Sequence, residues 1–228
     1  MTELDLFSKA SLGETPLMTR RLIQLFLGLS LYGLSIGLIV RADLGLDPWD
    51  VLSQGIFERF AEPAGLDFGM VVNLIGMAVL LLWIPLRQKP GIGTIANVLV
   101  IGSVAGLALR YIPADPVLPV RSLFLATGIV LNGVASGAYI GAGLGPGPRD
   151  GLMTGLVART GWPIKAVRTA IELTVVAAGW ALGGSVGVGT ILYALAIGPL
   201  VQIFLPAFTV GKEDGRKTLP GGKPTRPA

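Results

Sequence analysis

At the end of a long apolar run the chain reads Leu44-Gly45-Leu46-Asp47-Pro48-Trp49-Asp50-Val51-Leu52. One hundred positions later it reads Leu144-Gly145-Pro146-Gly147-Pro148-Arg149-Asp150-Gly151-Leu152. Both stretches interrupt an apolar segment with glycine, proline and charged residues. We therefore interpret the fold as organised around two copies of one motif, each of which follows a membrane-spanning segment.

The composition is that of a membrane protein. Hydrophobic residues make up 52% of the 228 positions, and the mean hydropathy is +0.70. A soluble domain of this size needs more polar residues to cover its surface. Apolar runs of about 20 residues recur, which is the length needed to cross a hydrocarbon core about 30 Å thick. The 33 glycines fit close packing of helices through small residues.

The sequence contains no Cys and no His. This inventory excludes disulfides, thiolate metal sites and Cys nucleophiles, and it lacks the commonest metal ligand and general base. No nucleophile–base arrangement is visible, so we expect no enzyme activity, no metal and no cofactor. The net charge of +4 comes from loops and tails, and predicts cytoplasmic anchoring at the lipid bilayer rather than nucleic-acid binding.

The two halves align without a gap when residues 21–56 are placed on residues 121–156. The identical pairs are Arg21/Arg121, Leu25/Leu125, Gly28/Gly128, Leu31/Leu131, Gly33/Gly133, Gly37/Gly137, Ala42/Ala142, Leu44/Leu144, Gly45/Gly145, Pro48/Pro148, Asp50/Asp150, Leu52/Leu152 and Gly55/Gly155. A second motif, Gly91-Ile92-Gly93-Thr94-Ile95, recurs as Gly187-Val188-Gly189-Thr190-Ile191. Chance is a poor account of a register held this long, so we predict an internal duplication.

We expect an all-α, polytopic membrane protein. The predicted spans are residues 22–40, 68–86, 92–111, 123–139, 164–182 and 190–208. Residues 48–60 and 148–159 are too short and polar for ordinary spans, and are predicted to form re-entrant or broken helices. The predicted divisions are a cytosolic tail (1–20), repeat 1 (21–115), repeat 2 (116–210) and a disordered basic tail (211–228).

Three spans in each half place the two repeats in opposite orientations, which is the inverted-repeat plan of many secondary transporters. With both termini in the cytoplasm, the Lys and Arg residues obey the positive-inside rule. If the short segments do cross, the chain has eight crossings and parallel repeats, and the charge totals are unchanged. The polarity of the short segments favours six crossings.

Each motif is predicted to start a helix. In the first copy Asp47 is placed as the N-cap, Pro48 as the first helical residue and Asp50 as the third, and Pro148 and Asp150 hold the equivalent places in the second. One interpretation is structural: Asp50 and Asp150 accept hydrogen bonds from backbone N–H groups that the helix leaves free.

The other interpretation is that both helix starts face one ligand site. Free N–H groups and positive dipole ends suit an anion or a carboxylate, and Arg149 would strengthen such a site. Asp50 and Asp150 could instead bind a proton or cation for coupling. The copies differ at Trp49/Arg149, which favours a specialised site. The candidate binding residues are Pro48, Trp49, Asp50, Pro148, Arg149 and Asp150.

Polar residues inside predicted spans form a second set. Glu172 follows Arg168 by one helical turn, which indicates either a functional group or an ordinary i,i+4 ion pair. Asn97 and Asn132 are typical of hydrogen bonds between helices. Asn97 and Tyr193 occupy equivalent places after the Gly-x-Gly-Thr motif, so they could line one cavity.

Three motifs carry a resemblance to a known family: the stretch 42–52, the stretch 145–153 and Gly-x-Gly-Thr. Over residues 21–208 the chain resembles the YczE branch of the YczE/YitT-type bacterial integral membrane proteins. The resemblance implies a multi-pass protein of the bacterial inner membrane. It supplies no catalytic residues and implies little about activity.

The architecture predicts a transporter or exporter of a small polar or anionic solute, with the motif residues as its site. The alternative is a membrane scaffold or regulatory protein that acts through a partner. A homo-oligomer is compatible with either. The fold by itself does not choose between them.

Overall fold

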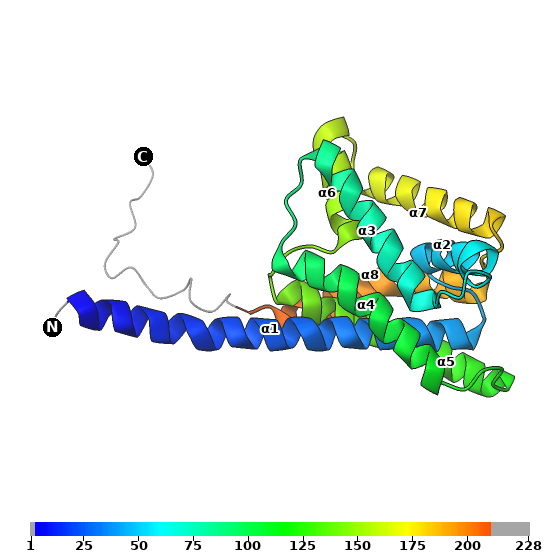
Figure 1. Ribbon diagram of the computed structural model, residues 1–228, viewed down its shortest axis with the longest axis horizontal. Coiled ribbons are helices and arrows are strands. Elements are labelled where there is room, and N and C mark those ends of the chain that lie inside the picture. Colours follow the sequence, from blue (N-terminus) through cyan, green and yellow to red (C-terminus); the bar gives the residue numbers. More distant parts are fainter. Residues whose placement is uncertain (1–2, 211–228) are drawn as a thin grey trace, which may run out of the picture.

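The computed structural model describes residues 3–210, and the positions of side chains from residue 17 onward. All regular elements in this range are helices (Figure 1). They are α1 (Glu3–Ala42), α2 (Pro48–Ile56), the π-helical turn η1 (Phe57–Ala61), α3 (Phe68–Leu86), α4 (Ile92–Tyr111), α5 (Leu118–Gly141), α6 (Pro148–Thr160), α7 (Ile164–Ala181) and α8 (Val188–Phe208).

Five of these helices are long and apolar enough to cross a membrane: residues 17–42 of α1, and α3, α4, α5 and α8. They coincide with five of the six predicted spans. The sixth, α7, is a helix of 18 residues as expected, but it carries Lys165, Arg168 and Glu172 and is not among the five. Helix α1 runs unbroken from Glu3 to Ala42, so residues 3–20 of the predicted tail continue into the first span as one helix. The predicted basic tail, 211–228, lies outside the described residues.

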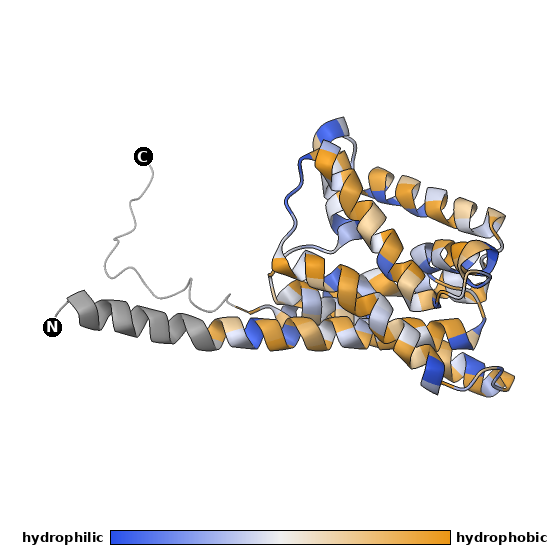
Figure 2. Ribbon diagram, in the orientation of Figure 1, coloured by the Kyte–Doolittle hydropathy of each residue, from blue (hydrophilic) through white to orange (hydrophobic). Residues whose placement is uncertain are grey.

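Hydrophobic residues recur along the long helices (Figure 2), and many of the large ones are exposed. Leu81 and Ile84 on α3 are 61% and 72% exposed, and Leu195 on α8 is 71% exposed. Soluble proteins rarely expose apolar patches of this extent. Hydrocarbon is the environment that such a surface fits.

The centre of the molecule is an antiparallel contact between α1 and α5. Gly28 of α1 faces Tyr139 near the end of α5, and Gly128 near the start of α5 faces Ile39 at the end of α1. A Cβ atom on Gly28 would lie 2.8 Å from the Tyr139 amide nitrogen, so a larger residue does not fit. The repeated glycines therefore let the two helix backbones approach closely.

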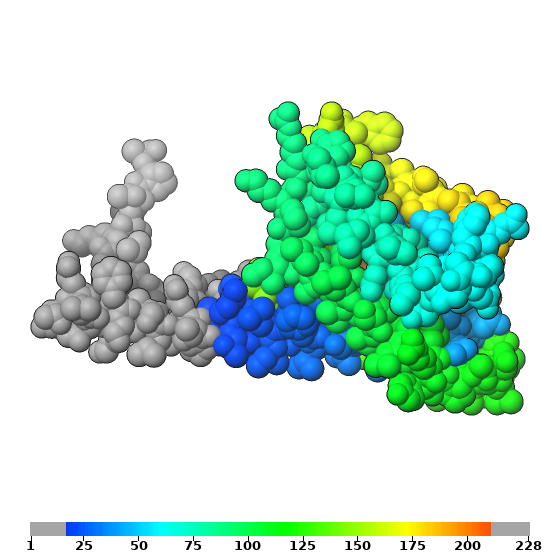
Figure 3. All heavy atoms as spheres, in the orientation of Figure 1, coloured from blue at the N-terminus to red at the C-terminus, as the bar shows by residue number. Residues whose placement is uncertain are grey.

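The remaining helices pack around this pair. The long helices α4 and α8 contact the first helix of their own half, whereas the short helices contact the other half. Gly33 of α1 faces α4, and its counterpart Gly133 of α5 faces α8. The short helices contact the other half: Gly55 of α2 faces α7, and Gly155 of α6 faces α3. Figure 3 shows the side chains of α3 and α4 covering the face of the molecule between α1 and α6.

The Gly-x-Gly-Thr motifs receive the loops of the opposite half. The amide of Gly189, at the start of α8, donates to the Leu44 carbonyl at 2.7 Å. The amide of Gly93, at the start of α4, donates to the Leu144 carbonyl at 2.8 Å. Each of the two repeated Gly-x-Gly-Thr motifs thus binds the loop that leads into a short helix of the other half.

Candidate functional site

A cavity of about 360 Å³ lies between the starts of α2 and α6. This volume is within the range of about 300–1,000 Å³ that small-molecule sites occupy. Residues of α1, α3, α4, α5, α7 and α8 complete its wall. Its polar lining consists of Tyr32, Asp47, Asn97, Ser136, Tyr139, Arg149, Asp150, Arg168, Glu172, Tyr193 and Gln202.

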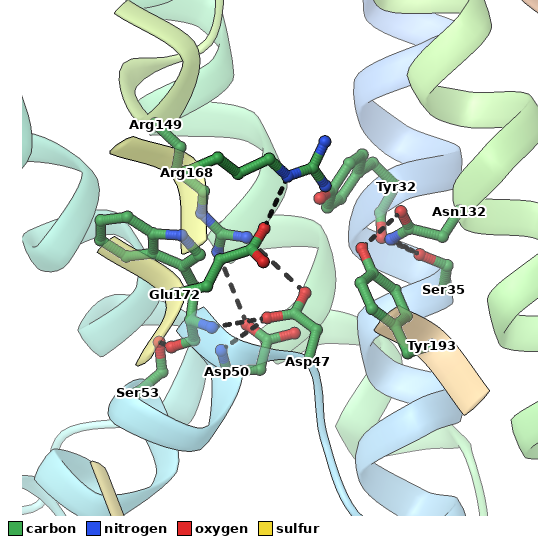
Figure 4. Close-up of polar contacts among 11 residues, drawn as sticks. Tyr32, Ser35, Asp47, Asp50, Ser53, Asn132, Arg149, Arg168, Glu172 and Tyr193 are labelled. Atoms are coloured by element: carbon green, nitrogen blue, oxygen red, sulfur yellow. Dashed lines mark hydrogen bonds and ion pairs between the residues drawn. The ribbon is translucent and has the colours of Figure 1, made fainter. Parts of the chain in front are cut away.

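A cluster of charges joins the two short helices at this cavity (Figure 4). The guanidinium of Arg149, on α6, lies 3.6 Å from Asp47 Oδ2 and 3.8 Å from Asp50 Oδ1. Both carboxyl groups are almost completely buried, with Asp47 1% and Asp50 0% exposed. The candidate residues from the two copies of the motif therefore meet in space, although Asp50 lies just behind the cavity wall.

The helix starts lie where the sequence predicts them, at Pro48 and Pro148. Asp47 is the N-cap of α2: its Oδ1 accepts hydrogen bonds from the amides of Trp49 and Asp50, each at 2.8 Å. The capping role expected for Asp50 is wrong. Both of its carboxylate oxygens are buried and accept no hydrogen bond within the described part of the chain, because Asp47 already satisfies the free amides.

Trp49 and Arg149, which occupy the same place in the two copies of the motif, lie against each other. The guanidinium carbon of Arg149 lies 5.1 Å from the centre of the Trp49 ring. This is the geometry of a cation–π contact. Both side chains line the cavity, together with Pro48 and Pro148.

Asp150 differs from its counterpart in its surroundings. It lines the cavity, and its Oδ2 accepts a hydrogen bond from the Tyr139 hydroxyl at 3.0 Å. It does not cap α6 through its side chain. Trp83 of α3 anchors the start of α6, since its indole N–H donates to the Pro148 carbonyl at 3.0 Å.

The polar residues expected within spans divide into two groups. Arg168 and Glu172 form the expected ion pair at 2.8 Å, and both line the cavity, as does Asn97. Asn132 does not line it. Its amide donates to Ser35 Oγ at 2.9 Å and its oxygen accepts from the Tyr193 hydroxyl at 3.0 Å. Asn132 therefore positions Tyr193, which lines the cavity.

Five polar lining residues were not among the binding residues predicted from sequence: Asp47, which was expected only to cap α2, and four residues of the apolar helices. Tyr139 and Ser136 of α5 and Gln202 of α8 reach the cavity, as does Tyr32 of α1. Their signal was a polar side chain within an apolar span, but helix-to-helix hydrogen bonding produces the same signal. Only the position of the cavity separates the two roles.

The charge of the site is negative. Asp47, Asp50, Asp150 and Glu172 face two cations, Arg149 and Arg168, which leaves a formal excess of two negative charges among the described residues. In that part of the chain no three His, Cys, Asp or Glu side chains gather as metal ligands. The site suits a polar ligand that hydrogen-bonds to the lining side chains and interacts with their carboxylates.

The apolar helices, with a polar cavity between them, define a multi-pass helical membrane protein. Residues 19–206 match a protein family described as a family of unknown function (DUF6198). The chain belongs to this YczE-type family, which confirms the resemblance in the motifs.

Two relatives illustrate the family. The chain is 42% identical over 181 residues to an uncharacterized protein from Haemophilus influenzae, covering 79% of this chain and 81% of the relative. It is 34% identical over 182 residues to the uncharacterized membrane protein YczE from Bacillus subtilis, covering 79% and 83%. No solved structure matches the chain.

Proposed function

We propose that this protein is a transporter that moves a small polar solute across the bacterial inner membrane, with the cavity as its binding site. The observation that carries the proposal is the meeting of Asp47, Asp50 and Arg149. These ionisable groups come from the starts of two short helices that lie among apolar spans; both aspartates are buried, and the Arg149 side chain is 31% exposed. Ionisable groups in such a place are costly, and typically mark the path of a solute or ion.

The orientation of the helices supports this proposal. Equivalent helices α1 and α5 are antiparallel, as the Gly28–Tyr139 and Ile39–Gly128 contacts require. Two halves with three spans each would place them so, whereas eight crossings with parallel repeats would not. The inverted plan, a binding site at the interface of the halves and short helices that start at the site are common to many secondary transporters. Both termini are then on the cytoplasmic side.

The charges of the site favour a solute without net negative charge. The amides at the start of α2 already bind the Asp47 carboxylate, so they are not free for an anion. Arg149 faces two carboxylates. An anionic solute, one of the two classes expected from the sequence, would meet an excess of negative charge and would have to displace these pairs.

The test is flux into proteoliposomes that contain the full-length chain. The solute panel would hold matched small molecules: choline and ethylammonium as cations, glycine as a zwitterion, glycerol as a neutral polyol and acetate as an anion. At least one should exchange faster than in protein-free vesicles. Asp50→Asn, Arg149→Gln and Asp150→Asn should each reduce that rate at least tenfold.

Asp67→Asn is the matched control. Asp67 caps α3 at the surface, where its Oδ1 accepts from the Met70 amide, and Asn can make the same cap. It should transport as the unchanged chain does. If all variants fold and no solute or variant differs from protein-free vesicles, the transport proposal is overturned, and a scaffold acting through a partner protein becomes the better account.

A further inference from the structure

The buried charges at the start of α2 do not balance. Asp47 and Asp50 lie side by side (Figure 4), and both residues are buried. A single guanidinium, that of Arg149, contacts them both. If both carboxyl groups are ionised, one negative charge stays uncompensated in a site with almost no access to water, and burial of an unpaired charge is strongly unfavourable.

The two carboxyl groups differ in what supports a negative charge. Asp47 accepts two backbone amide hydrogen bonds. Asp50 accepts none in the described residues, although both of its oxygens are buried. An ionised carboxylate can only accept hydrogen bonds, whereas a protonated carboxyl group can also donate one. Asp50 has no donor to accept from among the described residues, so it is the carboxyl group that can carry a proton.

The surrounding elements do not supply a second unpaired cation. Arg168 on α7 is paired with Glu172 at 2.8 Å. Asp150 on α6 accepts from Tyr139 on α5. Nearby tyrosine hydroxyls are uncharged at neutral pH. The titratable and charged groups that line the cavity beside the pair are Tyr32 (α1), Tyr139 (α5), Arg149 and Asp150 (α6), Arg168 and Glu172 (α7) and Tyr193 (α8).

We infer that Asp50 carries an exchangeable proton, and that the solute is a small organic cation whose positive charge replaces it. In the empty state protonated Asp50, ionised Asp47 and Arg149 sum to zero charge. In the loaded state the proton has left Asp50 for water, both carboxylates of this cluster are ionised, and the cation restores the neutrality of the three groups. Asp150, which accepts from the Tyr139 hydroxyl, lies outside this count in both states. One proton thus moves against one cation. The exchange rests on the proposed transport function, whereas the proton on Asp50 does not.

Infrared difference spectroscopy tests the proton directly. At pH 7 the protein without solute should show a carbonyl stretch from a protonated carboxylic acid. Asp50→Asn should remove that band, and the control Asp67→Asn should retain it. Equal band intensities in the unchanged chain and in Asp50→Asn would overturn the inference. Addition of choline or ethylammonium should weaken the band in the unchanged chain, and acetate or glycerol should not.

Proteoliposomes with a pH-sensitive dye in the lumen test the exchange. An inward gradient of the transported cation should make the lumen more alkaline, and Asp50→Asn should abolish this signal. If a solute moves without proton movement, or only an anion moves, the exchange is overturned while transport stands. If no solute moves but the infrared band behaves as expected, the proposed function fails and the proton on Asp50 stands.

Discussion

At the scale of single residues, the most informative position is the one at which the two copies of the motif differ, Trp49 in the first and Arg149 in the second. Arg149 occupies the place of Trp49, lies against its ring, and faces both Asp47 and Asp50. A symmetric pair of motifs would have no such contact. The two copies are therefore similar as helix starts and different as parts of a site.

Arg149→Gln should destabilise the protein. It leaves the buried Asp47 carboxylate without its cation, which we expect to lower the free energy of unfolding by about 2 kcal/mol. Adding Asp47→Asn should restore part of the loss, because Asn still caps α2 but carries no charge. Thermal unfolding in detergent would measure both. Equal stability of Arg149→Gln and the unchanged chain would contradict the expected ion pair.

The matched control is Arg110→Gln. Arg110 pairs with Asp67 at 3.3 Å, but its side chain is 68% exposed. Exposed pairs contribute little, so the loss should stay below about 1 kcal/mol.

At the scale of elements, the short helices are held by the opposite half of the chain. α6 packs on α3, and α2 packs on α7. The loops that lead into α2 and α6 lie on the starts of α8 and α4. The site is therefore assembled from both halves, and neither half contains it alone.

Trp83→Phe should weaken the attachment of the start of α6 to α3. The change leaves the Pro148 carbonyl without the indole donor in a buried place, since Trp83 is 2% exposed. We expect a loss of about 1–3 kcal/mol in the free energy of unfolding. Trp180→Phe is the control, because Trp180 is 70% exposed and should change stability by about 0.5 kcal/mol or less. Similar losses for the two variants would rule out the proposed anchoring role.

Gly45→Ala should disrupt the loop before α2. Gly45 has φ +107°, and a Cβ atom there would lie 2.5 Å from the Gly187 nitrogen. Strain and overlap together should cost about 3 kcal/mol or more. Gly65→Ala separates the two effects: Gly65 has φ +75° but open space around it, and should cost about 1 kcal/mol. Urea unfolding of both variants would show whether packing adds to strain.

At the scale of the whole molecule, the antiparallel contact of α1 with α5 favours six crossings over eight. The charged helix α7 is the sixth crossing on this account. Arg168 and Glu172 on it line the cavity, so these two charged residues face the site, while Leu173 (65% exposed) and Trp180 face outward. A span that borders a polar cavity can carry such charges without exposing them all to lipid.

Cysteine labelling in intact cells tests this topology, because the chain has no native Cys. With six crossings, a membrane-impermeant maleimide should label Glu62→Cys from outside and should label Pro90→Cys only after lysis. Eight crossings reverse the two results. Thr160→Cys should be protected in both cases and serves as the reference for membrane integrity. Protection of Glu62→Cys in intact cells would contradict the six-crossing proposal.

Much of the site could be predicted at the level of residue type. The helix starts at Pro48 and Pro148 follow from local rules, because proline fits the first turn and its missing N–H is not needed there. The charged residues of the motif could be chosen as candidates because they interrupt an apolar segment in the sequence. The role of Asp50 could not be predicted. Two neighbouring carboxyl groups could accept from the same free amides, and only the structure shows that Asp47 does so.

The sequence by itself determined the helical membrane class, the positions of the helices and the family, because apolar runs and glycine–proline breaks act over a few residues. The tertiary structure decided which helices meet. It brought Arg149 to Asp47 and Asp50 across about one hundred positions of chain, and placed Tyr32 and Tyr139 on the wall of the same cavity. Contacts between distant segments depend on packing in three dimensions, which no local pattern encodes.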